Sequence, residues 1–207
     1  MSGPRPAPDE RVAYASRPDW QDAWAPMVDA VGTVFGDGAV VYGADRVEAG
    51  LVRRYVEPLE FGSGLHHDPE VARSHGHPDV IAPYTSLLMF CVGPLWSPGD
   101  PAVFTSAERN AQPARSPVAE RRARLQPYTS EYFATDMEMD FVRPVAVGER
   151  VGRRRSQRLA SCTPKETRVG RGAFLVWESE IVDEGDEVVA RVRTGVYSYV
   201  PHRTGTS

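Results

Sequence analysis

The chain has 207 residues, 41% of them hydrophobic and 25% charged, so it has the composition of a folded globular protein and not of a disordered one. Its formal net charge of −4 at pH 7 gives no general attraction to nucleic acid or to an anionic membrane surface. No apolar run approaches the ~20 residues of a transmembrane helix, and the N-terminus lacks the apolar core of a secretory signal. We therefore expect a cytoplasmic protein with neither a nucleic-acid nor a membrane partner.

The N-terminal part predicts a flexible tail followed by a helical extension. Residues 1–17 are rich in proline, glycine and charge, which is typical of a tail. Residues 18–38 contain apolar residues at helical spacing, and Pro26 should kink this helix or divide it into two short ones. Trp20 and Trp24 should pack in the core, or alternatively seal an interface with a partner.

The next part predicts mostly helices. A short strand is expected at residues 39–42, a helix at residues 47–59 and a shorter helix at residues 69–76. Residues 80–96 are the most apolar segment and predict a buried helix of about 10–12 residues. Cys91 lies within it and is expected to be a small buried hydrophobe without a disulfide.

The second half predicts a β-sheet. Residues 97–130 have little periodicity and predict a long surface insertion, with a helical piece at residues 118–125. Helices followed by strands favour the α+β class over α/β, with the sheet wrapped around the apolar helix. Residues 39–201 should form this single domain, and residues 202–207 a second tail. The expected strands are at residues 132–142, 150–162, 172–183 and 188–200.

The most informative stretch is residues 55–68, YVEPLEFGSGLHHD. It combines the end of a helix, a glycine-rich turn and the cluster His66, His67 and Asp68. Such a loop places an imidazole and a carboxylate beside the apolar helix, where general acid–base chemistry could be housed.

Three stretches together resemble one known family. Residues 47–88 resemble a helix, active loop and central-helix unit, FVRPVAVGERV at residues 141–151 resembles a turn into a long strand, and residues 170–200 resemble a final β-hairpin. The family is the MaoC-like dehydratase/hydratase superfamily, which has the hot-dog fold, and the resemblance covers residues 40–200. The chain is most similar to the dehydratase-like half that occurs as an N-terminal half-domain or as a separate subunit.

The resemblance implies that the chain adds or removes water at a 2-enoyl/3-hydroxyacyl thioester. In catalytic members the loop reads F-A-x-x-S-G-D-x-N-P-L-H-x-D, and its Asp and His activate the water. Aligned without gaps, that Asp falls on Phe61 and the Asn on Ser63, while the His and the last Asp fall on His66 and Asp68. Half of the catalytic pair is therefore missing, because a phenylalanine cannot accept a proton. The adjacent Glu60 could replace it only if the loop shifts by one residue.

The resemblance also implies roles for individual residues. His66 would be the surviving acid–base residue, supported by Ser63 and Asp68. Phe61 would be a core plug or a wall of the acyl tunnel, and we favour the plug. No cofactor is expected beyond the CoA or carrier-protein thioester that is the substrate. The positions implied to bind the thioester and its oxyanion are Phe61 and the start of the apolar helix, at Pro83, Tyr84, Thr85 and Ser86.

Members of this family form their sites at dimer interfaces, so a homodimer or a heterodimer with another hot-dog subunit is expected. The missing carboxylate leaves a first alternative, a non-catalytic acyl-binding subunit whose partner carries the Asp/His pair. A second alternative is a hot-dog thioesterase, in which water attacks the carbonyl carbon and not the alkene.

Simpler structural roles remain open for the same residues. His66 could cap a turn or pair with Asp68, and Asp68 could be the N-cap of the helix at residues 69–76. The side chains of His66, His67, Asp68, His75 and His77 are suitable metal ligands, but their spacing matches no standard zinc pattern. The arginines of the strand at residues 150–162 could bind a phosphate of the carrier or form a solvated face; they are Arg150, Arg153, Arg154, Arg155 and Arg158.

Overall fold

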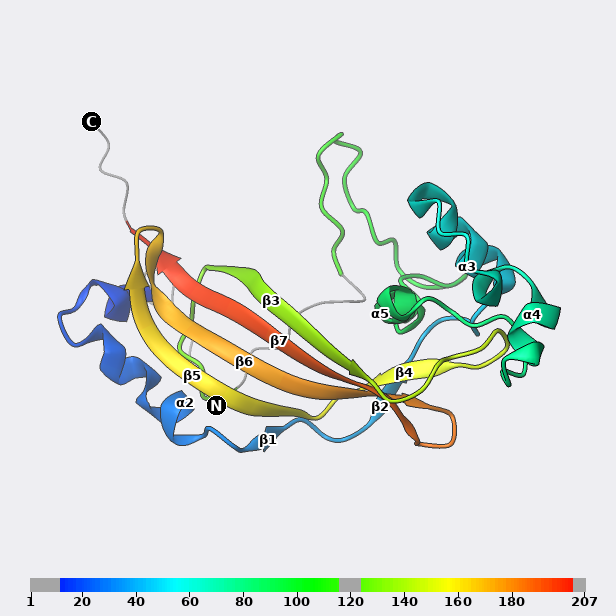
Figure 1. The fold of residues 1–207 in the computed structure, drawn as a ribbon. Coiled ribbons are helices and arrows are strands. Elements are labelled where there is room, and N and C mark those ends of the chain that lie inside the picture. Colours follow the sequence, from blue (N-terminus) through cyan, green and yellow to red (C-terminus); the bar gives the residue numbers. More distant parts are fainter. Residues whose placement is uncertain (1–11, 116–123, 203–207) are drawn as a thin grey trace.

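The computed structural model describes residues 12–115 and 124–202. Its centre is a curled sheet of seven strands, with the N-terminal helices at one end and α3, α4 and α5 at the other (Figure 1). The helical elements, with η for a 3₁₀ helix, are η1 (Ala13–Ser16), η2 (Trp20–Trp24), α2 (Ala25–Asp29), α3 (Ala49–Val56), η3 (Glu57–Leu59), η4 (Gly64–His66), α4 (Pro69–Ser74), η5 (Tyr84–Ser86) and α5 (Leu87–Phe90). The strands are β1 (Val34–Phe35), β2 (Val40–Tyr42), β3 (Glu131–Phe141), β4 (Val151–Arg154), β5 (Gln157–Thr167), β6 (Gly170–Asp183) and β7 (Val188–Pro201).

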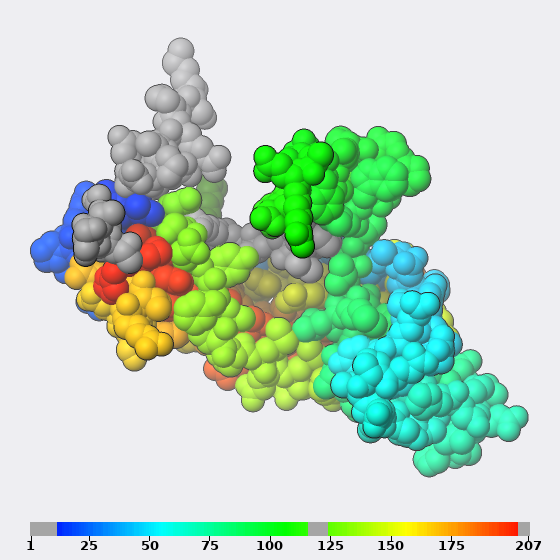
Figure 2. All heavy atoms as spheres, turned by 90° about the horizontal axis from the view of Figure 1, so that it is seen from above, coloured from blue at the N-terminus to red at the C-terminus, as the bar shows by residue number. Residues whose placement is uncertain are grey.

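The sheet is antiparallel and is organised around β6. One edge of β6 pairs with β7, and its other edge pairs with β5 and then with β4. β3 pairs with the outer edge of β7. On the other side of the sheet, β1 pairs with β5 and β2 pairs with β4. Figure 2 shows β3, in yellow-green, at the surface of the molecule. The predicted strand at residues 150–162 is therefore two strands, β4 and β5.

Two apolar clusters hold the helices on the sheet. At one end Leu87 and Phe90 of α5 pack with Ile181 and Val192. At the other end the N-terminal extension packs Trp20, Trp24 and Met27 against Leu159 and Leu175. Since these side chains leave water, their burial is the main stabilising contribution at both ends. The packing role predicted for the two tryptophans is confirmed.

The helix predicted in residues 80–96 is wrong in length. Only η5, with three residues, and α5, with four, are helical. The chain leaves the helix after Phe90 because the carbonyl of Val92 accepts a hydrogen bond from the amide of Ala44 at 2.9 Å. A Cβ on Gly43 would lie 1.9 Å from the carbonyl oxygen of Phe90, so only glycine permits this close approach.

The remaining predictions on chain organisation have mixed outcomes. Pro26 lies at the start of α2 and separates it from η2, as predicted. Residues 13–16, which were assigned to the tail, form η1, while residues 1–11 and most of the helical piece at 118–125 lie outside the described residues. The division into tails, extension and domain stays a prediction. No helix in the described ranges is long and apolar enough to cross a bilayer.

Both cysteines are free and buried. Burial raises the pKa of the Cys91 thiol to about 12, although Arg153 opposes the effect. Burial alone raises the pKa of Cys162 to about 11. Because the thiolate is the nucleophilic form, neither side chain is suited to nucleophilic catalysis at neutral pH.

Candidate active site

The loop that carries the predicted site begins where the helix formed by α3 and η3 ends. Glu60 follows η3 in a left-handed conformation, with φ of 50°, and this turns the chain out of the helix. Next comes η4, whose last residue is His66. The amide of Asp68 then donates to the carbonyl of Gly64 at 2.9 Å, which closes the loop before α4.

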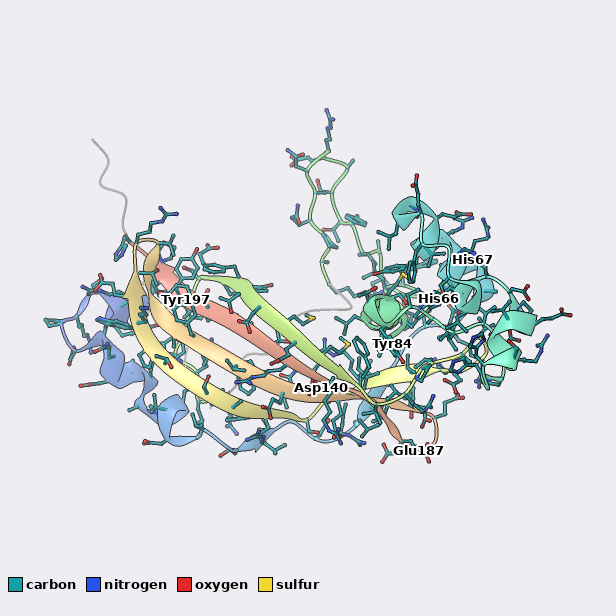
Figure 3. All side chains as sticks on the ribbon, viewed as in Figure 1. His66, His67, Tyr84, Asp140, Glu187 and Tyr197 are labelled. Atoms are coloured by element: carbon teal, nitrogen blue, oxygen red, sulfur yellow. The ribbon has the colours of Figure 1, made fainter. Side chains whose placement is uncertain are left out.

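His66 is fixed against the segment that leads into η5. Its side chain is buried, with 9% of the residue exposed, and its Nδ1 atom lies 2.7 Å from the carbonyl oxygen of Ile81. The amide of Ile81 in turn donates to the carbonyl of Leu65 at 3.1 Å. Figure 3 shows His66 beside α5, with Tyr84 nearby. Both polar backbone groups of Ile81 thus hold the loop against the segment that precedes η5.

This contact sets the tautomer of His66. A carbonyl oxygen can only accept a hydrogen bond, so Nδ1 must carry the proton. In the neutral ring Nε2 then bears the lone pair, and no described residue donates a hydrogen bond to it. His66 therefore presents a proton acceptor on the side of the ring away from Ile81.

The side chain of Phe61 is not the buried plug that we favoured. It is 48% exposed, and its ring centroid lies 5.2 Å from that of His66 at an angle of 35°. His67 holds the Phe61 backbone in place, since its Nε2 donates to the Phe61 carbonyl at 2.9 Å. The aromatic ring therefore covers one side of His66 where the family resemblance places a carboxylate.

Ser63 and Asp68, the two residues predicted to support His66, form no side-chain contact with it in the described structure. The carbonyl of Ser63 accepts the amide of His66 at 3.0 Å, and the Ser63 hydroxyl does not cap η4. The carboxylate of Asp68 accepts the amides of Glu70 at 2.8 Å and Val71 at 3.5 Å, so it is the N-cap of α4. It forms no hydrogen bond with His66 in the described structure.

Glu60 does not take the place of the missing carboxylate. The residue is exposed, and its side chain forms neither a hydrogen bond nor an ion pair with His66 within residues 12–115 and 124–202. The structure thus brings Phe61 and His66 together but leaves Glu60 and Asp68 outside that contact.

The predicted oxyanion segment is a single turn. Pro83 precedes η5, and its carbonyl accepts both the amide and the hydroxyl of Ser86, at 2.9 and 2.7 Å. Tyr84 is half-exposed, and its ring centroid lies 4.6 Å from that of Phe141. The amides of Tyr84 and Thr85 are the ones that such a turn leaves for a ligand. A helix this short has a smaller dipole than the predicted helix of about 10–12 residues would have.

A polar network that the sequence analysis missed connects this segment to the sheet. Arg143 donates to the carboxylate of Glu149 at 3.0 Å and also binds Asp183. Glu149 accepts the amide of Ala146 at 3.1 Å, and Ala146 forms a β-bridge with Ile81. The chain of contacts thus runs from Arg143 to the β-bridge at Ile81, the residue whose carbonyl contacts His66. The FVRPVAVGERV stretch contains Arg143, Ala146 and Glu149, so its two charged residues were the sequence signal for this network.

The charges of this network stabilise one another. Burial acts to raise the pKa of Asp183, but the amide of Glu187 and the Arg143 guanidinium outweigh it and hold that pKa below its ordinary 3.8. Burial likewise acts to lower the pKa of Arg143, and its hydrogen bonds to Glu149 and Asp183 reverse the effect and raise it. Both groups are therefore charged at neutral pH, as a bidentate arginine site requires.

The other candidate sites have structural roles. Within the described residues no three His, Cys, Asp or Glu side chains are grouped to hold a metal ion. His75 binds the carbonyl of Val71 at 2.9 Å. The strand arginines are engaged with carbonyls, a hydroxyl or carboxylates, through the pairs Arg150–Gly43, Arg153–Ser179, Arg154–Glu180, Arg155–Asp37 and Arg158–Glu178. They form a structural face and not a phosphate cluster.

Comparison with protein families decides the family. The model described as "FAS1-like, dehydratase domain region" matches residues 30–192, which is most of the chain. The chain belongs to this dehydratase family. The prediction of a MaoC-like dehydratase/hydratase with an α+β hot-dog fold is confirmed.

An individual relative of this chain has a low sequence identity to it. A "Probable enoyl-CoA hydratase alpha subunit" from Thermomonospora curvata is 28% identical over 165 residues. That match covers 78% of the chain and 48% of the relative, so the chain spans about half the length of the relative.

A solved structure shares the fold. A chain of the ChsH1–ChsH2 complex from Mycobacterium tuberculosis matches with a TM-score of 0.58 at 22% identity, over 90% of this chain and 99% of that one. A MaoC-like dehydratase from Rhodospirillum rubrum matches with a TM-score of 0.48 at 17% identity, over 81% of this chain and 95% of that one.

Proposed function

We propose that this chain is a subunit of an acyl-thioester hydratase/dehydratase, which adds water to a 2-enoyl thioester or removes it from the 3-hydroxyacyl product. The observation that carries the proposal is the buried contact between His66 Nδ1 and the Ile81 carbonyl, at 2.7 Å. It leaves Nε2 as a fixed proton acceptor at the start of the central helix. The family match to a dehydratase region supports the same reaction class.

The proposed reaction uses Nε2 of His66 as a general base. In the hydration direction Nε2 of His66 accepts a proton from water as the oxygen bonds to C3 of the enoyl group. The electron pair of the C2–C3 double bond moves toward the thioester carbonyl and forms an enolate. Proton delivery to C2, from the imidazolium or from an acid of the partner, completes the 3-hydroxyacyl thioester. The Ile81 carbonyl stabilises the imidazolium throughout, because it accepts the Nδ1 proton in both states.

The enolate oxygen requires hydrogen-bond donors. The amides of Tyr84 and Thr85 in the η5 turn are the proposed donors. Ser86 holds that turn through its hydrogen bonds to Pro83. No cofactor is proposed beyond the CoA or carrier-protein thioester, and the location proposed for the subunit is the cytoplasm.

A second hot-dog subunit completes the proposed enzyme. β3 pairs with β7 on one edge, and no described strand pairs with its other edge. An unpaired edge strand can add the strand of another chain. The named relatives include a hydratase alpha subunit and a chain from a two-component complex, which supports a heteromer.

Phe61 favours a second candidate function, a non-catalytic subunit. Its ring lies where the family resemblance places the catalytic Asp, and it covers one side of His66. Such a subunit would bind the acyl group or stabilise the partner, and the partner would carry the complete Asp/His pair.

Hydration of crotonyl-CoA, followed as loss of enoyl-thioester absorbance, separates these functions. The chain is assayed alone and with a co-encoded hot-dog subunit, each with native His66 and with His66→Asn. Activity that depends on His66 supports the catalytic subunit, and activity of the complex that survives the substitution supports the non-catalytic one. Absence of hydration in every combination would remove the enzyme assignment.

A further inference from the structure

The stretch FVRPVAVGERV, at residues 141–151, runs antiparallel to the segment that leads into η5. The amide of Ala82 donates to the carbonyl of Val145 at 2.8 Å, and the amide of Val147 donates to the carbonyl of Val80 at 2.8 Å. The β-bridge that holds the partner of His66 lies between these two hydrogen bonds. The stretch therefore forms a short antiparallel ladder that fixes the chain just before the oxyanion turn.

The ladder stops before η5 begins. Tyr84 is the next residue that could extend it, but it is helical, and no hydrogen bond joins it to residues 141–151 in the part of the chain that the structure describes. The turn closes on itself, because the amides of Ser86 and Leu87 donate to the carbonyls of Pro83 and Tyr84. Such bonds set the shape of a 3₁₀ turn but not its tilt relative to the sheet.

The first residue of the stretch, Phe141, makes the contact that the ladder lacks. Its ring centroid lies 4.6 Å from that of Tyr84, with an angle of 38° between the two rings. Phe141 is also the last residue of β3 and lies opposite Ala190 of β7, which belongs to the apolar cluster around α5. The ring is therefore fixed to the sheet, and it supports the ring of Tyr84.

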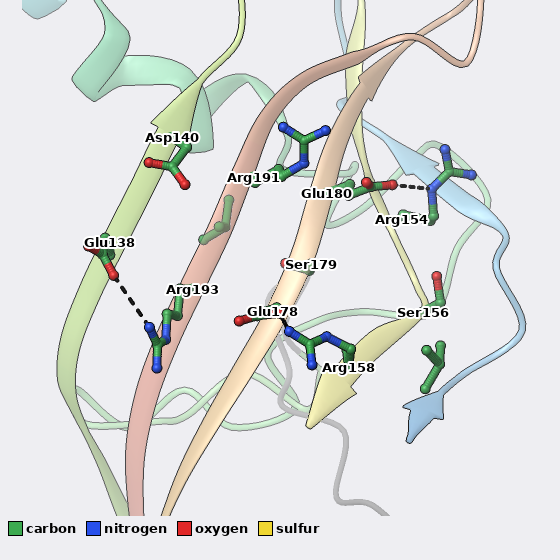
Figure 4. Close-up of a pocket in the computed structure, with 12 residues that line it drawn as sticks. Glu138, Asp140, Arg154, Ser156, Arg158, Glu178, Ser179, Glu180, Arg191 and Arg193 are labelled. Atoms are coloured by element: carbon green, nitrogen blue, oxygen red, sulfur yellow. Dashed lines mark hydrogen bonds and ion pairs between the residues drawn. The ribbon is translucent and has the colours of Figure 1, made fainter. Parts of the chain in front are cut away.

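Phe141 points to the side of β3 that faces α5. Met139, two residues earlier on the same face, packs against the same apolar cluster. Asp140 lies between them in the sequence and on the opposite face, where it borders a groove together with Arg191 and Arg193 (Figure 4). The alternation of the strand thus directs the aromatic residue, and not its acidic neighbour, toward η5.

The position of η5 matters for the chemistry because the proposed oxyanion donors belong to it. These are the amides of Tyr84 and Thr85, and both residues are exposed. A displacement of catalytic groups by about 1 Å can lower a rate by about a hundredfold. A single turn lacks the hydrogen-bond ladder that would hold the first residues of a longer helix, so its donors need support from outside.

We propose that Phe141 is a positioning residue for the hydration reaction. Its ring supports Tyr84 and so holds the η5 amides where the enolate oxygen forms. The reaction in this inference rests on the proposed function, whereas the contact itself does not. Phe141 acts through Tyr84 and takes no part in proton transfer.

Substitution of the ring tests this role in the full chain, assayed together with the co-encoded hot-dog subunit. Phe141→Ala should lower kcat for crotonyl-CoA by about tenfold to a hundredfold. KM should change by less than about threefold, because the turn acts on the transition state and not on the bound carrier. Phe141→Tyr retains the aromatic ring and should restore kcat to within about twofold of wild type.

Hydrogen exchange measures the turn without any substrate. In Phe141→Ala the amides of Ser86 and Leu87 should exchange about tenfold faster or more, because the unsupported turn opens more often. The amides of Ala82 and Val147 should keep their protection, because the ladder does not depend on the ring. Unchanged exchange of Ser86 and Leu87 would overturn the inference.

Phe133→Ala is the matched control. Phe133 belongs to the same strand, is 44% exposed and contacts the rings of Tyr197 and Tyr199 at 5.6 and 5.8 Å. Its substitution should leave both kcat and the exchange of η5 as in wild type. An equal loss of kcat in the two alanine variants would mean that any aromatic residue of β3 has this effect, and it would overturn the role of Phe141.

The two measurements separate this inference from the hydratase assignment. If wild type hydrates crotonyl-CoA in no combination, the assigned reaction fails, and hydrogen exchange alone decides whether Phe141 holds the turn. If wild type is active and Phe141→Ala keeps its kcat, the reaction stands and the positioning role of Phe141 is removed.

Discussion

The Nδ1 atom of His66 and the carbonyl oxygen of Ile81 are 2.7 Å apart, and this contact joins the active loop to the start of the central helix. It fixes the tautomer, the orientation of the ring and the position of Nε2 in one interaction. Catalytic histidines need such an orienting partner, because a freely rotating ring delivers its proton poorly.

Substitutions of His66 should separate its contribution to stability from its contribution to catalysis. In His66→Asn the side-chain amide can still donate to the Ile81 carbonyl, so the free energy of unfolding should change by less than about 1 kcal/mol. His66→Ala leaves that buried carbonyl unpaired and should cost about 1–3 kcal/mol. Both variants should lose hydration in the complex with the partner subunit. Urea denaturation and the crotonyl-CoA assay check the two effects; equal destabilisation by both variants would contradict the role given to Nδ1.

A carboxylate at position 61 should increase activity. Phe61→Asp would place a proton acceptor next to His66 at the position where the family resemblance expects one, and a cooperating pair can be worth orders of magnitude in rate. We expect kcat/KM for crotonyl-CoA to rise by about tenfold or more. Phe61→Asn is the matched control, because it has a similar size but cannot accept a proton at neutral pH. An equal gain in both variants would mean that removal of the ring, and not the carboxylate, is responsible.

Asp68 should behave as a helix cap. Asp68→Ala removes the acceptor for the amides of Glu70 and Val71 and should lower the free energy of unfolding by about 1 kcal/mol. Asp68→Ser retains a capping oxygen but no negative charge, and should restore most of the stability and of the activity. Thermal denaturation and hydration of both variants check this. Loss of activity in Asp68→Ser at native stability would instead assign Asp68 a catalytic role.

Asp183 should make stability depend on acid pH. Its folded pKa lies below the ordinary value of 3.8, so the unfolded chain binds its proton first as pH falls. The contribution is thus complete above about pH 5 and is lost as pH falls below about 4 toward the folded pKa. Asp183→Asn should lower the free energy of unfolding at pH 7 by about 1–3 kcal/mol and flatten this acid dependence.

The control for that experiment lies on the same hairpin. Glu184→Gln removes a carboxylate whose ion pair to Arg46 is about half-exposed, so its effect at pH 7 should be small. Arg143→Lys tests the other partner of Asp183, because an ammonium group cannot bind Glu149 and Asp183 with the same planar fork. Urea denaturation at several pH values measures all three variants.

Most helices and strands could be predicted, because the residues that specify them lie within or next to the element itself. Pro26 separates η2 from α2, and alternation gives β6 and β7 almost to the residue. The length of the central helix could not be predicted, because it ends through a contact with a distant glycine, Gly43, and with the amide of Ala44. Gly93 and Pro94 already end the helix that the sequence predicts, and these tertiary contacts move its end back to Phe90.

The candidate site was predictable only in part for the same reason. The loop motif identified His66, but its orienting partner is a backbone carbonyl, which has no signature in the sequence. The family resemblance favours Phe61 as a plug of the core, yet the residue follows the left-handed turn at Glu60 and is half-exposed. Asp68 followed the rule for residues that precede a proline at the start of a helix.

Because α5 ends at Phe90, a long connection without strands follows it, and insertions or deletions have different consequences there and within the sheet. The described residues between Phe90 and Glu131 contribute no strand to the sheet, so an insertion or deletion there leaves every strand register as it is. Doubling the length of such a connection costs only about 0.6 kcal/mol of closure entropy. Homologous proteins are thus free to differ in length at this place, whereas one residue gained or lost within β6 would turn its inward side chains outward.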